Sequence, residues 1–96
     1  METKVQTIGC TIADTVRDRL EARLLKLSFA ESLLVRVECV ITQEGNEYQV
    51  EFKMNFRGMT PVVIKDSGYN LDSTINLLWH KVVRKAKREK EKKQDH

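Results

Sequence analysis

Every second residue is apolar in two stretches of the chain, and this period of two predicts β-strands. Between Tyr48 and Phe56 the apolar residues alternate with polar or charged ones, as in a strand with one buried and one solvated face. The stretch before it alternates in the same way, and the segment EGNE at 44–47 has the composition of a turn. We therefore expect two successive strands, the first of which directs one set of side chains to the core, namely Val35, Val37, Cys39 and Ile41.

Two shorter segments complete the predicted sheet. Lys4–Ile8 precedes a glycine that allows a turn, and Val62–Lys65 follows Pro61, which suits the first position of a strand. The second, third and fourth strands then form an antiparallel meander with one polar face.

Apolar residues at three- and four-residue steps predict two amphipathic helices. The first helix follows Thr11 and Asp14, which have the spacing of a capping box, and should end near 27–29. Its apolar positions are Ile12, Val16, Leu20, Leu24 and Leu27. The second helix begins at Leu71, with Asn70 or Asp72 as its cap, and extends over about 71–93.

The predicted order of elements is β-α-β-β-β-α. Each helix has an apolar surface, and one face of the sheet is polar, so both helices should pack on the opposite face. We expect a single α+β domain over residues 1–96, built as a two-layer sandwich of a four-stranded sheet with both helices on one face.

Positive charge is concentrated at the end of the chain. Residues 81–96 contain eight basic and three acidic side chains, whereas residues 1–80 contain nine basic and eleven acidic ones, within a total net charge of +3. Eight of the thirteen residues at 81–93 are Lys or Arg. A local excess of this kind is typical of a surface that binds a polyanion.

The helical period directs many of these charges to one side. On a wheel, an arc roughly 100° wide beside the apolar face contains Lys81, Arg84, Lys85, Arg88 and Lys92, whereas Lys87 and Lys90 lie elsewhere. The first helix has a weaker row along one edge of its apolar stripe: Arg19, Arg23 and Lys26, with Arg17 on the other edge. Such rows can neutralise RNA phosphates, although a solvated helix face has a similar composition.

Candidate chemistry elsewhere in the sequence is sparse. His80 lies outside the apolar arc with no ligand at metal spacing, and no nucleophile motif or Gly-rich phosphate loop is present. Aromatic residues on the 48–56 strand could stack bases, but their alternation favours a place in the core. Cys10 and Cys39 are expected to be free thiols, and no run of about 18 apolar residues suggests a membrane span. We expect a cytoplasmic protein that is not an enzyme, with no metal, cofactor or small-molecule substrate.

The two helices and the order of elements resemble the ribosome hibernation-promoting factors, also called ribosome-associated inhibitors or sigma-54 modulation proteins. The segment IADTVRDRLEARLLKL is similar to the family's first helix and places Arg17, Arg23 and Lys26 on its basic positions. HKVVRKAKREKEK is similar to its last helix and places Lys81, Arg84, Arg88, Lys90 and Lys92 on basic positions. The chain departs from the family pattern in carrying Asp72 in place of an aromatic residue, and Asn76 and His80 in place of acids.

The resemblance implies a short-form, non-catalytic ribosome hibernation factor. Such a protein binds ribosomal RNA of the small ribosomal subunit, in the channel for messenger and transfer RNA, and inhibits translation during stress or stationary phase. The RNA-binding residues expected from the wheel and the resemblance together are Arg19, Arg23, Lys26, Lys81, Arg84, Lys85, Arg88, Lys90 and Lys92. The alternative is a protein-interaction or transcription-modulating module whose basic helix meets an acidic partner.

Overall fold

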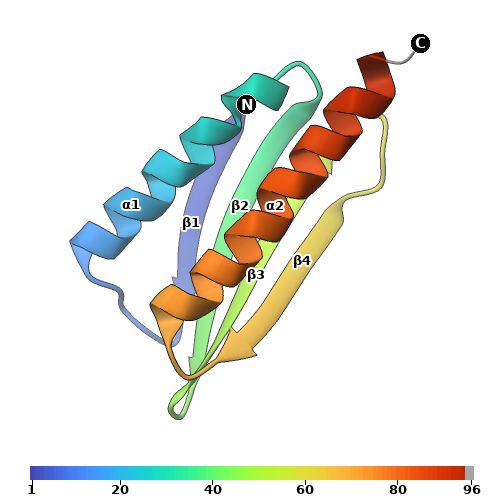
Figure 1. Ribbon diagram of the computed structural model, residues 1–96. Helices are drawn as coiled ribbons and strands as arrows, with labels where there is room; N and C mark the ends of the chain where they lie inside the picture. The colour runs from blue at the N-terminus through green and yellow to red at the C-terminus, as the bar shows by residue number, and fades with distance from the viewer. Residues whose placement is uncertain (95–96) are drawn as a thin grey trace.

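The protein forms two layers, a four-stranded sheet and a pair of helices that cover one of its faces (Figure 1). The computed structural model describes the backbone of residues 1–94 and the side chains of residues 1–92. The elements in chain order are β1 (Glu2–Ile8), α1 (Asp14–Leu25), the 3-10 helix η1 (Lys26–Ala30), β2 (Leu34–Glu44), β3 (Glu47–Phe56), β4 (Val62–Gly68) and α2 (Leu71–Gln94). The predicted α+β architecture and the order of its elements are confirmed.

The strands lie in the sheet in the order of the sequence, β1-β2-β3-β4. β1 pairs with β2 in parallel, which requires the crossover that α1 and η1 supply, and the other two pairs are antiparallel. As a result α1 and α2 run in the same direction across the sheet, with α1 over β1 and α2 over the β3–β4 half (Figure 1).

The core lies between the helices and the sheet. On β3 the alternation works as the sequence predicts, because Val50, Phe52, Met54 and Phe56 are all buried. Trp79 of α2 packs on Phe52 with ring centroids 6.2 Å apart and ring planes 55° apart, a tilted geometry that aromatic pairs favour. The β3 phenylalanines are therefore part of the core and are not available to stack bases.

The prediction that Val35 of β2 faces the core is wrong. Val35 is 44% exposed, and Leu34 is fully buried in its place. The pairing with β3 shifts between Leu34 and Arg36, and such a bulge changes which face a side chain occupies. Beyond the bulge, Val37, Cys39 and Ile41 face the core as predicted.

The ends of the helices differ from the sequence predictions in detail. The N-cap of α1 is Ala13, with no side-chain cap, so the predicted capping box is wrong because Thr11 lies two residues too early to form it. At the start of α2, Asn70 is the cap, since the backbone N–H of Ser73 donates to its Oδ1 at 3.0 Å. α1 ends at Leu25 and the chain then tightens into η1, so the helical segment reaches slightly beyond the predicted end.

Candidate RNA-binding surface

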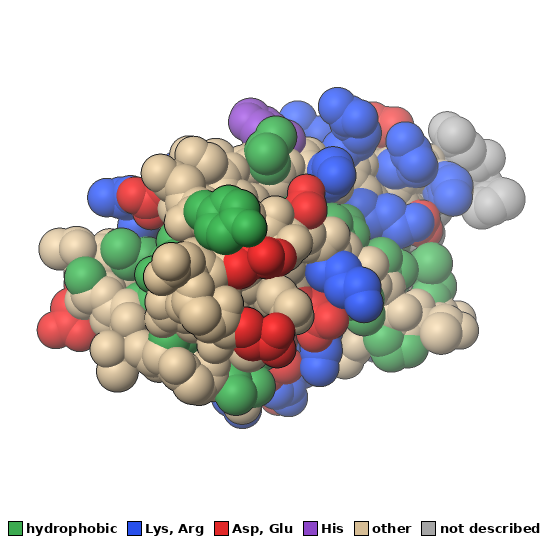
Figure 2. Space-filling model, turned by 90° about the horizontal axis from the view of Figure 1, so that it is seen from below, with side chains coloured by type: hydrophobic (Ala, Val, Ile, Leu, Met, Phe, Trp, Pro, Cys, Tyr) green, Lys and Arg blue, Asp and Glu red, His purple; other side chains and the backbone are tan. Residues whose placement is uncertain are grey.

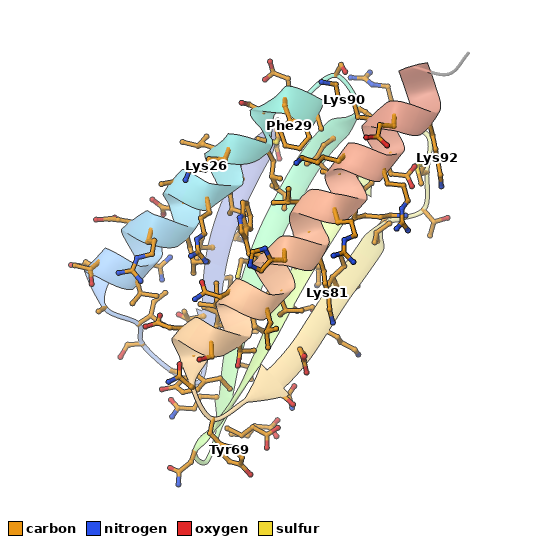
Figure 3. All side chains as sticks on the ribbon, viewed as in Figure 1. Lys26, Phe29, Tyr69, Lys81, Lys90 and Lys92 are labelled. Atoms are coloured by element: carbon orange, nitrogen blue, oxygen red, sulfur yellow. The ribbon has the colours of Figure 1, made fainter. Side chains whose placement is uncertain are left out.

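The basic residues predicted to share one arc of α2 lie on the flank of the helix that faces away from α1. The row that packs on the sheet is Ile75, Leu78, Val82 and Ala86, all buried. Figure 3 shows Lys81 and Lys92 on the β4 side of the helix and Lys90 on the α1 side. On a helical wheel Arg84, Lys85 and Arg88 all fall within about 60° of Lys81, so the predicted stripe occupies one flank. We call Lys81, Arg84, Lys85, Arg88 and Lys92 the α2 stripe.

Three members of the α2 stripe are exposed and make no ion pair with any of the side chains at 1–92. These are Lys81, Arg84 and Arg88. Figure 2 shows Lys and Arg side chains gathered at the side of the molecule where the chain ends, with acidic side chains nearer the centre of that view. A cluster of exposed like charges with no paired carboxylate gives a local positive potential that attracts anions.

The other two members of the stripe are tied to Glu89. The Nζ atoms of Lys85 and Lys92 both donate to Oε1 of Glu89, at 2.9 and 3.4 Å. Glu89 is only 5% exposed, and the hydrogen bond from Lys85 is the main reason that its pKa lies below the ordinary value. In the sequence Glu89 reads as an acid that dilutes the positive run. Its position about five turns after Leu71 places it on the row that faces the core, and that signal could have singled it out.

The row on α1 lies on the flank that faces α2. Arg19 and Arg23 line a small groove between the helices, opposite Asp72 and Asn76 of α2. Arg17, on the other flank, donates from its Nη1 to the backbone oxygen of Val5 at 3.0 Å. The α1 row and the α2 stripe therefore lie on opposite sides of α2 and do not merge into one strip.

Two lysines of α2, Lys87 and Lys90, lie outside the α2 stripe, toward the α1 side of the helical wheel. Lys90 extends over the ring of Phe29 in η1, with its Nζ 5.7 Å from the ring centroid, as in a cation–π contact. Lys87 is exposed, and Lys26 is exposed at the start of η1 (Figure 3). The helical layer thus presents basic side chains from one flank of α2 across to α1.

The open face of the sheet arranges its charges differently. On this face Lys4 lies 3.8 Å from Glu38, and Arg36 lies 3.4 Å from both Glu2 and Glu38. Lys53 is 3.8 Å from Glu51 on the same strand. Opposite charges are therefore paired on the sheet face, whereas on α2 the exposed Lys81, Arg84 and Arg88 are grouped and make no ion pair with any of the described side chains.

Cys39 and His80 do not contribute to the basic surface. Burial raises the pKa of the Cys39 thiol to about 12, so at neutral pH it is an inert part of the core. His80 is exposed on α2, and no group of His, Cys, Asp or Glu in the part of the chain that the structure describes is arranged to hold a metal. Within the same part, no helix is long and apolar enough to cross a membrane.

Comparison with known proteins shows the family of the chain. The sequence profile of the family described as "Sigma 54 modulation protein / S30EA ribosomal protein" matches residues 3–94. The chain belongs to this family. The match includes α1 and α2 in full, so every basic residue discussed above lies within the family domain.

Solved structures show the same fold. The Thermus thermophilus Protein Y N-terminal domain superposes with a TM-score of 0.75 at 21% identity, covering 92% of this chain and 98% of that one. A ribosomal subunit interface protein from Coxiella burnetii gives a TM-score of 0.79 at 16% identity, covering 94% and 98%. Comparison with curated proteins gives no significant match.

The three positions that the sequence predicts to depart from the family pattern all lie on α2. Asp72 and Asn76 line the interhelical groove opposite Arg19 and Arg23, and His80 is exposed on the outer surface. None of the three belongs to the α2 stripe.

Proposed function

We propose that the protein is a ribosome hibernation factor that binds the small ribosomal subunit in the channel for messenger and transfer RNA. Membership of the S30EA family supports this proposal, and a structural neighbour is described as a ribosomal subunit interface protein. The observation that carries it is the exposed basic surface of the helical layer, where Lys81, Arg84 and Arg88 make no ion pair with any of the side chains at 1–92, in contrast to the paired charges of the sheet face. We propose ribosomal RNA as its partner and the cytoplasm as its location.

Phosphate neutralisation is the binding chemistry. Each Lys supplies a mobile ammonium group and each Arg a planar fork that fits phosphate oxygens. Because these groups are mounted on two helices that pack on one sheet, their spacing is held and can follow phosphates that are themselves fixed. The residues proposed for this role are Arg19, Arg23, Lys26, Lys81, Arg84, Lys85, Arg88, Lys90 and Lys92.

The inhibitory action needs no catalysis. A folded domain that occupies the channel excludes messenger and transfer RNA, so initiation stops while the protein stays bound. Release restores the ribosome unchanged. This is the expected behaviour of a factor that keeps ribosomes idle during stress or stationary phase.

Sedimentation with purified small ribosomal subunits tests the proposal. We expect the protein to co-sediment with the subunit at low salt and to dissociate as salt is raised. If about six phosphates are contacted, the logarithm of the binding constant should fall against the logarithm of the salt concentration with a slope near −5. Absence of co-sedimentation at low salt would contradict the proposal.

Three further measurements test in turn the residues, the channel and the RNA partner. Replacement of Arg84, Lys85 and Arg88 by Glu should abolish co-sedimentation while the thermal unfolding curve stays cooperative. A competition with messenger RNA for the subunit should show mutual exclusion if the channel is the site. Association that persists after complete digestion of the RNA would instead favour an acidic protein partner.

A further inference from the structure

Glu89 occupies a position that a carboxylate rarely takes. It lies on the core-facing row of α2, with 5% of its surface exposed, in a helix whose other flank is strongly basic. Carboxylates are almost never so buried unless they are paired. The partners of Glu89 are Lys85 and Lys92, which lie four residues before it and three after it.

The contact fixes where the two ammonium groups lie. Both Nζ atoms bind the same oxygen, Oε1, at 2.9 and 3.4 Å, so they can be no further apart than the sum of these two distances. Neighbouring oxygens of a single phosphate can reach two groups at that spacing. Each ammonium has three N–H donors and uses one on Glu89, which leaves two on each lysine for an anion.

The exposures of the two lysines differ in a way that suits this arrangement. The side chain of Lys85 is 25% exposed and that of Lys92 is 64% exposed. Glu89 is thus shielded behind two lysines that remain accessible from the solvent side. Without the carboxylate, each four-carbon side chain would sample many rotamers.

We propose that Glu89 is a positioning residue that makes the α2 stripe selective for folded RNA over flexible single strands, by holding Lys85 and Lys92 as a preset pair for one phosphate. The inference rests on the proposed RNA-binding function and extends it to the class of RNA preferred. A fixed pair gains most when the phosphates are also fixed by folding, because neither partner then loses much conformational freedom on binding.

The negative charge of Glu89 should weaken binding to RNA, whereas its positioning of the two lysines should strengthen binding to folded RNA. These opposite effects make the proposal testable. Glu89 subtracts one charge from the stripe, which weakens attraction to any polyanion. If it acts only through charge, its removal should tighten binding to every RNA alike. If it positions the lysines, its removal should weaken binding to folded RNA while binding to a flexible strand stays the same or tightens.

The experiment compares Glu89→Gln with Glu91→Gln, a matched control. Glu91 is exposed on the same helix, makes no ion pair with any of the side chains at 1–92, and loses the same charge on substitution. Binding is measured to three probes: purified small ribosomal subunits, a transfer RNA as a folded RNA that needs no ribosome, and polyuridylate as a flexible strand.

Glu89→Gln should lower affinity for the two folded probes about tenfold, the loss expected for one charge-assisted hydrogen bond. Its affinity for polyuridylate should be unchanged or up to about threefold higher. Glu91→Gln should raise affinity for all three probes by similar factors and leave their ratio unchanged. An equal gain on all probes for Glu89→Gln would overturn the proposal.

Three more variants, one of them a matched control, test whether the effect is purely structural. Glu89→Asp keeps the charge but is too short to hold both lysines, so it should also lose selectivity; wild-type selectivity in this variant would contradict positioning. Lys92→Gln alters an exposed side chain and should lower the ratio of folded to flexible binding, whereas the matched Lys87→Gln should weaken all probes equally. Thermal unfolding of each variant verifies that it is folded.

The proposed ribosome binding and the role of Glu89 can fail independently of each other. Failure of the wild-type protein to bind small subunits would count against the proposed function, and the ratio of transfer RNA to polyuridylate binding would still test Glu89. Wild-type binding to subunits with an unchanged ratio in Glu89→Gln would retain the function and reject the role of Glu89.

Discussion

Both faces of the molecule carry acidic and basic residues, but the two faces arrange them in opposite ways. On the open sheet, Lys4 is directly opposite Glu38 and Arg36 is opposite Glu2 in the strand register, and each pair is close enough to neutralise itself. On α2, like charges recur at three- and four-residue steps, which places them side by side on one flank. Pairing makes the sheet face electrostatically quiet, and grouping makes the helical face attractive to anions.

The two arrangements of charge also differ in their effect on stability. Cross-strand opposite charges stabilise the sheet modestly, whereas like charges at helical spacing destabilise α2. The helix tolerates this because its other side buries Leu78, Val82 and Ala86 against the sheet. A surface that opposes stability in this way is typical of a binding site.

The largest expected effect comes from reversing charge on each face in turn. Replacement of Lys81, Arg84 and Arg88 by Glu should weaken binding to small subunits by about a hundredfold or more and reduce the salt slope by about three. The same change in net charge at the exposed Lys4, Lys53 and Lys65 of the sheet should change affinity by less than about threefold. Equal losses in the two triple variants would show that only net charge matters.

A smaller loss is expected on α1, where the two flanks can be compared directly. Arg19→Gln combined with Arg23→Gln should weaken binding about tenfold, because the two phosphate contacts proposed for these residues would be lost. Arg17→Gln removes instead the bond to the backbone of Val5 and should lower the melting temperature with little effect on binding. Titrations and thermal scans on the same samples distinguish the two outcomes, and a binding loss in Arg17→Gln equal to that of the double variant would contradict this assignment.

Acid should remove the pairing that Glu89 provides. The folded-state pKa of Glu89 lies below its ordinary value of 4.5, so its contribution to stability is present above that value and is lost as pH falls through the folded pKa. Urea unfolding between neutral pH and pH 3 should therefore show a stability difference between wild type and Glu89→Gln that shrinks in acid. A difference that is independent of pH would mean that the carboxylate charge does not contribute.

The smallest effect is the relief of repulsion within the α2 stripe. Arg84→Gln should stabilise the protein at low salt by about 0.3 kcal/mol, the usual size of a like-charge interaction between neighbouring turns. The gain should vanish in high salt, where such interactions are screened. Chemical unfolding at two salt concentrations provides the measurement, and a gain of equal size at both would exclude repulsion as its cause.

The periodicity of the apolar residues was sufficient to predict the fold. Buried positions recur at every second residue in the strands and at three- and four-residue steps in the helices. The alternation on β3 and the apolar steps on α2 both correspond to buried rows. The bulge at Leu34–Arg36 has no such signal, since it depends on how β2 pairs with β3. Which flank of α1 faces α2 likewise depends on packing between elements far apart in the chain.

The candidate site was only partly visible in the sequence for a related reason. Charge counts and a helical wheel identify the α2 stripe, but they treat every acid in the run as a diluting charge. Glu89 and Glu91 are alike in that count and differ in the fold, where one is buried between two lysines and the other is exposed. Only the direction of each side chain relative to the sheet separates them.

Lysine footprinting on the bound protein tests most directly whether the helical face is the RNA-binding face. The free protein and its complex with small ribosomal subunits are acetylated, and the extent of reaction at each lysine is read by mass spectrometry. We predict strong protection of Lys26, Lys81 and Lys92 on the helical layer, with Lys4, Lys53 and Lys65 on the sheet reacting as in the free protein. Protection of the sheet lysines with unchanged reaction on the helices would contradict the account.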